Sequence, residues 1–250
     1  MNAQLTRFVR AAGCAAVFLL APSAGQAAML LPGTVVPLTS ADILATPPGT
    51  LEASVIQPII SAAAGDYTGS LSAAVIRNAG GTLDFYYQIT NDPTSTDALS
   101  RNTNSRFASI VPPFSYSTEV FYRTDNAGLP AIFTAGDPDA TPLAAIRTAN
   151  ARVVAFQFES PVIPLVSGID PGETSMIVVI RTNATTFSGG FSAVIDGTTT
   201  TVNTFGPTGP IPPISTVPEP ASLLLLSSAF GVAGYVARHR DRRKKRSQGA

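Results

Sequence analysis

The chain has 250 residues, and its sixteen basic and sixteen acidic side chains cancel to a formal net charge of zero. Nine of the basic residues lie near the two ends, which leaves seven arginines for the middle of the chain against fourteen carboxylates. This acidic balance excludes nucleic acid as a partner of the middle, because phosphates repel it. The single cysteine, Cys14, and the single histidine, His239, also lie near the ends, so the middle has no zinc site, disulfide framework or Cys–His catalytic pair.

The amino terminus has the layout of a secretory signal peptide. Arg7 and Arg10 precede an apolar run over residues 11–21, and small residues follow it. Gly25 and Ala27 are small at the spacing that signal peptidase requires, which places cleavage after Ala27. We therefore expect residues 1–27 to form a signal helix that is removed on export.

Residues 28–205 have the pattern of one extracytoplasmic β domain. Apolar residues occupy the odd positions of 83–90, and residues 154–159 alternate in a similar way. Residues 176–180 form an uninterrupted apolar run of strand length, which indicates a central strand. The domain is therefore predicted to be mainly β.

Turn sequences separate the expected strands. They lie at residues 78–81, 125–128, 170–172 and 196–197. Short strands separated by turns every 8–12 residues or so are typical of an antiparallel β-sandwich. The pattern leaves the jelly-roll and immunoglobulin-like topologies open, and within the domain it favours a helix only over residues 140–149.

A linker rich in proline and glycine is expected over residues 206–217. The run 205–213 contains four prolines. Such a run is predicted to form neither a helix nor a sheet ladder, and its prolines favour an extended, semi-rigid spacer.

The carboxyl terminus has three consecutive parts, over residues 218–250. Pro218, Glu219 and Pro220 are followed by an uncharged run at 221–237, whose seventeen residues would span about 25 Å as a helix. A basic tail, 238–250, ends the chain and is expected to stay in the cytoplasm, so that the preceding domain faces outward. The basic residues of this tail are Arg238, Arg240, Arg242, Arg243, Lys244, Lys245 and Arg246.

These three parts, in this order, resemble the PEP-CTERM sorting signal of Gram-negative bacteria, a signal also described as the C-terminal region of ice-binding proteins. The resemblance covers about 30 residues. It implies that an exosortase recognises the Pro-Glu-Pro triplet and removes the tail. It also implies an intermediate anchored in the inner membrane by one transmembrane helix, followed by delivery to the cell surface or the exopolysaccharide matrix.

The middle of the chain has no motif that predicts catalysis, a cofactor or a metal. It lacks the histidine and the lysine that would activate a serine nucleophile, so we expect no enzyme. Paired carboxylates could serve a glycoside hydrolase, and Glu119, Glu159 and Glu173 are the candidates. Segments 91–97 and 137–139 carry oxygens that could bind calcium, although turn formation explains both.

Three functions follow as hypotheses. The first is a structural or adhesive protein of the cell surface or exopolysaccharide matrix. The second is a carbohydrate- or ice-binding module, for which the local hint is the threonine run 198–201. The third is the carboxylate-dependent glycoside hydrolase. Aromatic residues that could stack on sugars, or pack in the core instead, are Tyr67, Tyr86, Tyr87, Tyr116 and Tyr122.

Overall fold

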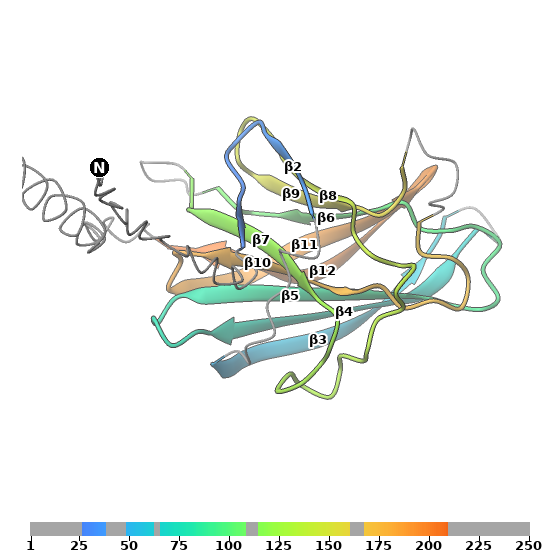
Figure 1. Ribbon diagram of the computed structural model, residues 1–250, viewed down its shortest axis with the longest axis horizontal. Helices are drawn as coiled ribbons and strands as arrows, with labels where there is room; N and C mark the ends of the chain where they lie inside the picture. The colour runs from blue at the N-terminus through green and yellow to red at the C-terminus, as the bar shows by residue number, and fades with distance from the viewer. Residues whose placement is uncertain (1–26, 39–48, 63–65, 109–114, 161–167, 210–250) are drawn as a thin grey trace, which may run out of the picture. The chain divides into compact units, whose positions relative to one another are not determined.

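A computed structural model describes residues 27–38, 49–62, 66–108, 115–160 and 168–209 of the chain. Within these residues the structure contains β-strands, turns and loops, and no helix (Figure 1). The strands are β1 (Ala28–Met29), β2 (Val35–Pro37), β3 (Thr50–Ile60), β4 (Thr68–Arg77), β5 (Leu83–Asn91), β6 (Arg101–Ser105), β7 (Thr118–Arg123), β8 (Ala144–Arg147), β9 (Val153–Gln157), β10 (Ile177–Thr182), β11 (Thr186–Asp196) and β12 (Thr198–Thr208).

The strands form two antiparallel sheets of six strands each. Sheet A has the order β1-β7-β10-β5-β4-β3, and sheet B has the order β12-β11-β6-β9-β8-β2. The expected mainly β, antiparallel architecture is therefore confirmed. The expected central strand is also confirmed, because β10 pairs with β5 on one side and with β7 on the other.

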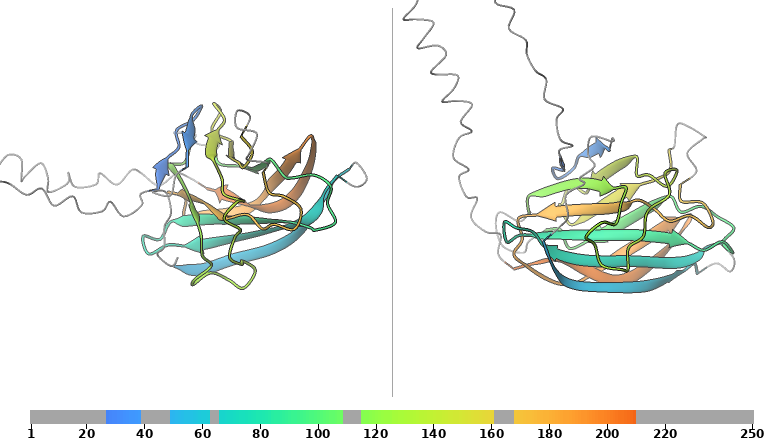
Figure 2. Two further views of the ribbon diagram at one scale, coloured as in Figure 1. Left: turned by 45° about the vertical axis from the view of Figure 1, so that its right-hand side comes forward. Right: turned by 60° about the horizontal axis from the view of Figure 1, so that its bottom comes forward.

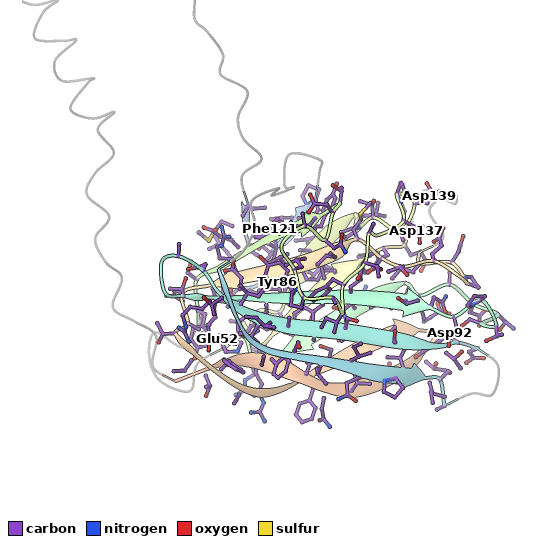
Figure 3. The ribbon with its side chains drawn as sticks, turned by 90° about the horizontal axis from the view of Figure 1, so that it is seen from below. Glu52, Tyr86, Asp92, Phe121, Asp137 and Asp139 are labelled. Atoms are coloured by element: carbon purple, nitrogen blue, oxygen red, sulfur yellow. The ribbon has the colours of Figure 1, made fainter. Side chains whose placement is uncertain are left out.

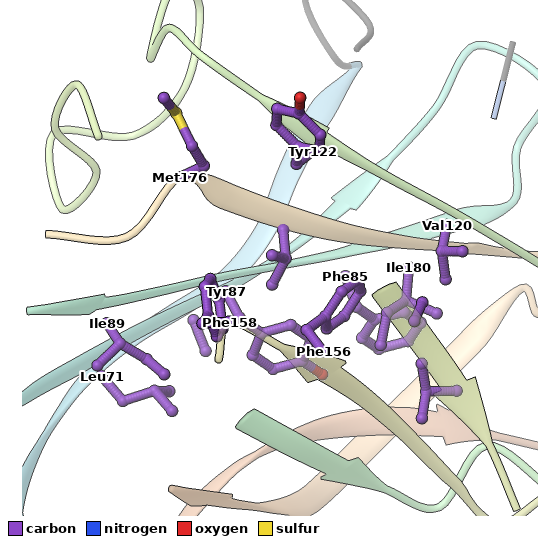
Figure 4. Packing of buried hydrophobic residues seen from close by; sticks show 14 of the residues in the cluster. Leu71, Phe85, Tyr87, Ile89, Val120, Tyr122, Phe156, Phe158, Met176 and Ile180 are labelled. Carbon is purple, nitrogen blue, oxygen red and sulfur yellow. The ribbon is translucent and has the colours of Figure 1, made fainter. Parts of the chain in front are cut away.

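The two sheets lie face to face over a shared core (Figure 2). Sheet A contributes Phe85, Tyr87 and Ile180 to this core, and sheet B contributes Phe156 and Val194. Figure 4 shows the large aromatic side chains of both sheets packed together. Burial of these side chains is the main term that holds the sheets together, because apolar surface is removed from water on both inner faces.

The outer face of sheet A carries a second, smaller core. The segment that follows β7 lays Leu129, Ile132 and Phe133 against this face, over Tyr86 and its apolar neighbours. Gln88 fixes the segment with two hydrogen bonds, one to the backbone oxygen and one from the backbone nitrogen of Thr134. Because the segment covers the polar side of β5, both faces of that strand are buried.

Two local predictions are wrong. Residues 144–147 form strand β8 rather than part of a helix, because Ala145 and Arg147 point into the domain while Ala144 and Ile146 point outward. The expected linker begins later than residue 206, since β12 continues to Thr208 and Pro207 pairs with Phe187. β12 is the edge strand of sheet B, where proline can be accommodated without loss of a ladder hydrogen bond.

The two predicted terminal helices lie outside the described residues. These are the signal helix at 1–27, of which the structure describes Ala27 alone, and the transmembrane helix at 221–237. In the part of the chain that is described, no helix has the length and hydropathy needed to cross a membrane.

Candidate functional site

The residues of the two processing sites lie at or beyond the limits of the described structure. Ala27 immediately precedes β1, so cleavage after Ala27 would leave that strand whole, while Gly25 lies outside the described residues. Pro218, Glu219, Pro220 and the basic tail at 238–250 also lie outside them. The structure therefore describes the domain between the two processing signals, and the sites below lie in that domain.

The carboxyl end of the domain is fixed in position. The hydroxyl of Tyr116 donates to the backbone oxygen of Gly209 at 2.8 Å. The hydroxyl of Thr186 donates to the backbone oxygen of Thr208 at 2.6 Å. Gly209 has a φ of +83°, a conformation that favours glycine. The chain therefore leaves the domain at a defined point beside Tyr116.

The amino end of the domain lies near the same point. The backbone nitrogen of Leu30 donates to the backbone oxygen of Thr118, two residues from Tyr116. The buried guanidinium of Arg147 donates to the backbone oxygens of Leu30, Phe107 and Tyr116. Burial without a carboxylate partner lowers the pKa of Arg147 to about 10, so the group stays charged at neutral pH. Arg147 thus joins the first residues of the domain to the segment that holds its last ones.

The five candidate tyrosines form no sugar-stacking surface. All are buried, with exposed fractions of 5% or less. The Tyr67 hydroxyl bonds Val194 and Thr200, and the Tyr87 hydroxyl donates to the backbone oxygen of Phe205 at 2.9 Å. Burial raises the pKa of Tyr87 well above its ordinary value. These side chains belong to the core and its rim.

The three candidate carboxylates do not converge. Glu119 pairs in register with Arg181, near the end of β10, whereas Glu173 precedes the start of that strand and accepts a hydrogen bond from the backbone nitrogen of Asp170. Glu159 is exposed and follows β9 in the other sheet. Two carboxylates that flank one glycosidic bond would have to lie close together. Glu119 lies at the opposite end of the domain from the other two, which are on separate segments.

The two candidate calcium segments are held by hydrogen bonds of their own. The carboxylate of Asp137 accepts from the backbone nitrogen of Thr174 at 2.7 Å, and the side chain of Asn91 donates to the backbone oxygens of Asp97 and Ile169. In the described ranges, no three His, Cys, Asp or Glu side chains are grouped so that they could hold a metal ion.

The threonine run is divided between the two faces of sheet B. Thr198 and Thr200 point inward, where they bond Ser61 and Tyr67. Thr199 and Thr201 are exposed on the outer face. A flat, regular threonine array therefore does not extend along this strand.

The outer face of sheet B is an open surface that the sequence analysis did not single out. Twelve of its residues form two complete rows across the sheet. Ten of them are small, apolar or hydroxyl-bearing, and the other two are Gln157 and the one charged residue, Arg101. The rows are Val35, Ile146, Ala155, Thr103, Ala193 and Thr201, and Pro37, Ala144, Gln157, Arg101, Ile195 and Thr199.

One aromatic side chain is exposed on this outer face. Phe191 is 46% exposed, pairs with the exposed Asn203, and lies beneath the guanidinium of Arg106 at 5.6 Å from its ring centroid. Arg106 has a φ of 73°, and its side chain reaches over the phenyl ring from the end of β6. The low charge of residues 186–205, where Asp196 is the one ionisable side chain, was the sequence signal for this surface.

Charge is divided between the two ends of the domain. We call the end that contains Gly209 and the turns at 78–82, 148–152 and 183–185 the exit end, and the opposite end the far end. Arg123, the last residue of β7, pairs with Asp125. The far end carries Arg101 and nine carboxylates, namely Asp66, Asp92, Asp97, Asp137, Asp139, Glu159, Asp170, Glu173 and Asp196. The exit end carries Glu52, Asp84, Glu119, Arg77, Arg106, Arg147, Arg152 and Arg181.

This division is visible in the structure. Figure 3 shows Asp92, Asp137 and Asp139 at one end of the strands and Glu52 toward the other. At the far end, burial and the charges of Asp97, Glu159 and Asp66 raise the pKa of Asp196. Asp196 is therefore close enough to Asp97, Glu159 and Asp66 for their charges to repel.

Comparison with known families identifies the tail. The chain carries the PEP-CTERM protein-sorting motif, whose family model matches residues 216–243. The match includes the Pro-Glu-Pro triplet and the uncharged run, and it confirms the predicted resemblance. The motif implies that the chain is an exported protein, processed by an exosortase and anchored transiently in the membrane. No curated protein and no solved structure matches the chain.

Proposed function

We propose that this chain is a structural or adhesive protein that is sorted to the cell surface or the exopolysaccharide matrix. The sorting motif at 216–243 is the observation that carries the proposal. In this scheme signal peptidase cuts after Ala27, the transmembrane helix at 221–237 holds the intermediate in the inner membrane, and exosortase then removes the tail. The domain that remains is a β-sandwich of two six-stranded sheets.

We further propose that the domain acts by contact rather than by catalysis, through the outer face of sheet B. Its two complete rows make a broad, nearly uncharged surface with a single arginine, in a domain that has a net negative charge. Few charges have to lose water when such a surface meets a polymer chain, which lowers the cost of contact. The location of Glu119 at the opposite end of the domain from Glu159 and Glu173 supports this proposal over a glycoside hydrolase.

Carbohydrate binding is the form of contact that one specific observation favours. Phe191 offers an exposed ring, and Asn203 lies beside it with an amide that can bond sugar hydroxyls. An ice-binding surface has less support, because Thr198 and Thr200 point inward and cannot contribute to an exposed threonine array.

Cosedimentation of the released domain with exopolysaccharide from the producing strain tests the proposal. A Thr201→Glu substitution places a charge on the outer face of sheet B and should reduce binding several-fold. The matched control is Ser54→Glu, which places the same charge on β3, the exposed edge strand of sheet A. Equal binding by both variants and the unmodified domain would contradict the proposal.

A further inference from the structure

Among the described residues, the exit end carries two exposed arginines that form no ion pair. Arg77 pairs with Glu52, and Arg181 pairs with Asp84. Arg106 and Arg152 are exposed and form no ion pair within the described part of the chain. They lie on adjacent segments, because the backbone nitrogen of Phe107 donates to the backbone oxygen of Arg152 at 3.0 Å. Together they form a basic patch at this end.

The patch is at the end of the domain from which the sorting tail leaves. The Tyr116 hydroxyl holds Gly209 there, and Pro218 follows nine residues later. Nine residues reach at most about 30 Å when fully extended. While the tail is intact and anchored, chain connectivity therefore keeps the exit end near the membrane surface.

The acidic far end does not cancel the basic patch. The eleven residues of β12 run from one end to the other, which corresponds to about 35 Å. The Debye length is about 8 Å at physiological ionic strength, so the charges of one end are screened at the other. The exit end itself carries five arginines and three carboxylates, Glu119 among them, so a charged surface near this end meets a net positive charge.

We propose that the exit end is a membrane-facing surface, and that Arg106 and Arg152 contact the headgroups of acidic phospholipids while the sorting tail is intact. Phosphate groups fit guanidinium donors in geometry and in charge. Two arginines bind such a surface weakly, but the short tether raises the local concentration of headgroups and makes the contact intramolecular. Removal of the tail abolishes this gain in local concentration, so the domain leaves the membrane when the tail is cut. This inference rests on the sorting motif. Because Arg106 also lies over Phe191, Arg152→Gln is the variant that separates it from the exopolysaccharide contact.

Energy transfer from a label on the exit end to a labelled lipid tests the proposal. The full chain, with Cys14 replaced by Ser, is reconstituted in phosphatidylcholine vesicles with or without phosphatidylglycerol. A donor is placed at Ala149→Cys, in an exposed exit-end turn, or at Thr94→Cys, in an exposed far-end loop. Transfer from residue 149 should rise with phosphatidylglycerol and fall again in high salt, and transfer from residue 94 should not rise.

Variants that remove one charge each test whether Arg106 and Arg152 make the membrane contact. Arg106→Gln and Arg152→Gln should each remove about half of the rise, since each removes one of two charges. Arg101→Gln, which removes one charge from the far end, is the matched control and should leave the rise intact. The proposal is overturned if transfer from residue 149 is equal in both kinds of vesicle, or if Arg101→Gln acts like the exit-end variants. It is also overturned if the rise depends on protein density, which would indicate contact between copies.

Discussion

Arg181 of β10 holds Asp84 of β5 through both carboxylate oxygens. Its Nε lies 3.2 Å from each oxygen and its Nη2 lies 2.9 Å from one of them. The Asp84 side chain is 1% exposed and also accepts a hydrogen bond from Asn78. The same guanidinium lies 5.2 Å from the ring centroid of Phe121, so one side chain ties β10 to both neighbouring strands of sheet A.

Replacing Arg181 with Gln should destabilise the domain by about 2–3 kcal/mol, because a buried carboxylate then loses its cation. The estimate is below the usual cost of breaking a buried pair, since the Arg181 side chain is 35% exposed and water screens part of the interaction. Urea unfolding measures the loss. The control is Arg77→Gln, which breaks the more exposed pair with Glu52 and should cost about 0.5 kcal/mol. Equal losses would show that the burial of Asp84 is unimportant.

Replacing Tyr87 with Phe should lower the free energy of unfolding by about 1–2 kcal/mol. The Tyr87 hydroxyl is buried and joins β5 of sheet A to the backbone of β12 in sheet B. The substitution removes this bond between the sheets and keeps the ring in the core. A variant as stable as the unmodified domain in urea would contradict this role.

Replacing Asp196 with Asn should stabilise the domain at pH 7. The folded-state pKa of Asp196 is raised by burial and by nearby carboxylates, so its ionised form is disfavoured by folding. That penalty is fully present above the raised pKa and disappears as the pH falls below the ordinary value. The gain in the urea midpoint should therefore vanish in acid and shrink in high salt. Asp139→Asn, at an exposed far-end position, is the control and should have little effect.

The exported protein should begin at Ala28. Arg7, Arg10 and the small residues Gly25 and Ala27 predict this cleavage. N-terminal sequencing of protein from the cell envelope measures it. Recovery of chains that still begin with Met1 would refute the signal peptide.

Replacing Glu219 with Ala should trap the longer, membrane-bound form. The triplet has one charged side chain, and its loss should prevent recognition by exosortase. Mass spectrometry of surface and membrane fractions, from a strain that carries the enzyme, gives the result. If the surface form of the unmodified protein still ends at Ala250, the helix is a permanent anchor and the sorting mechanism is wrong.

The strands with the strongest alternation could be predicted from the sequence. Which part of the chain packs against each face of a strand could not. The inward face of Leu83, Phe85 and Tyr87 is as expected. The opposite face of β5 is polar in the sequence, but Tyr86 on that face is buried because a segment more than forty residues away packs against it. Local periodicity contains no information about such a long-range contact.

The errors have physical causes in tertiary structure. The alanines of residues 140–149 favour a helix locally, but Arg147 has to reach three backbone oxygens inside the domain, and this requires a strand. In the candidate site, the hydroxyls of Tyr67, Tyr87 and Tyr116 find backbone partners, which allows these side chains to be buried. The open face of sheet B became recognisable only when β6, β9 and β11 were seen side by side.

The position of β12 determines how the domain bears mechanical load. Its last residues lead to the sorting tail, and eleven residue pairs join it to β11 over its whole length. A pull on the tail directed along β12 shears all of these pairs together, whereas a pull across the sheet would open them one after another. A domain that is loaded along β12 therefore resists in the stronger of the two directions.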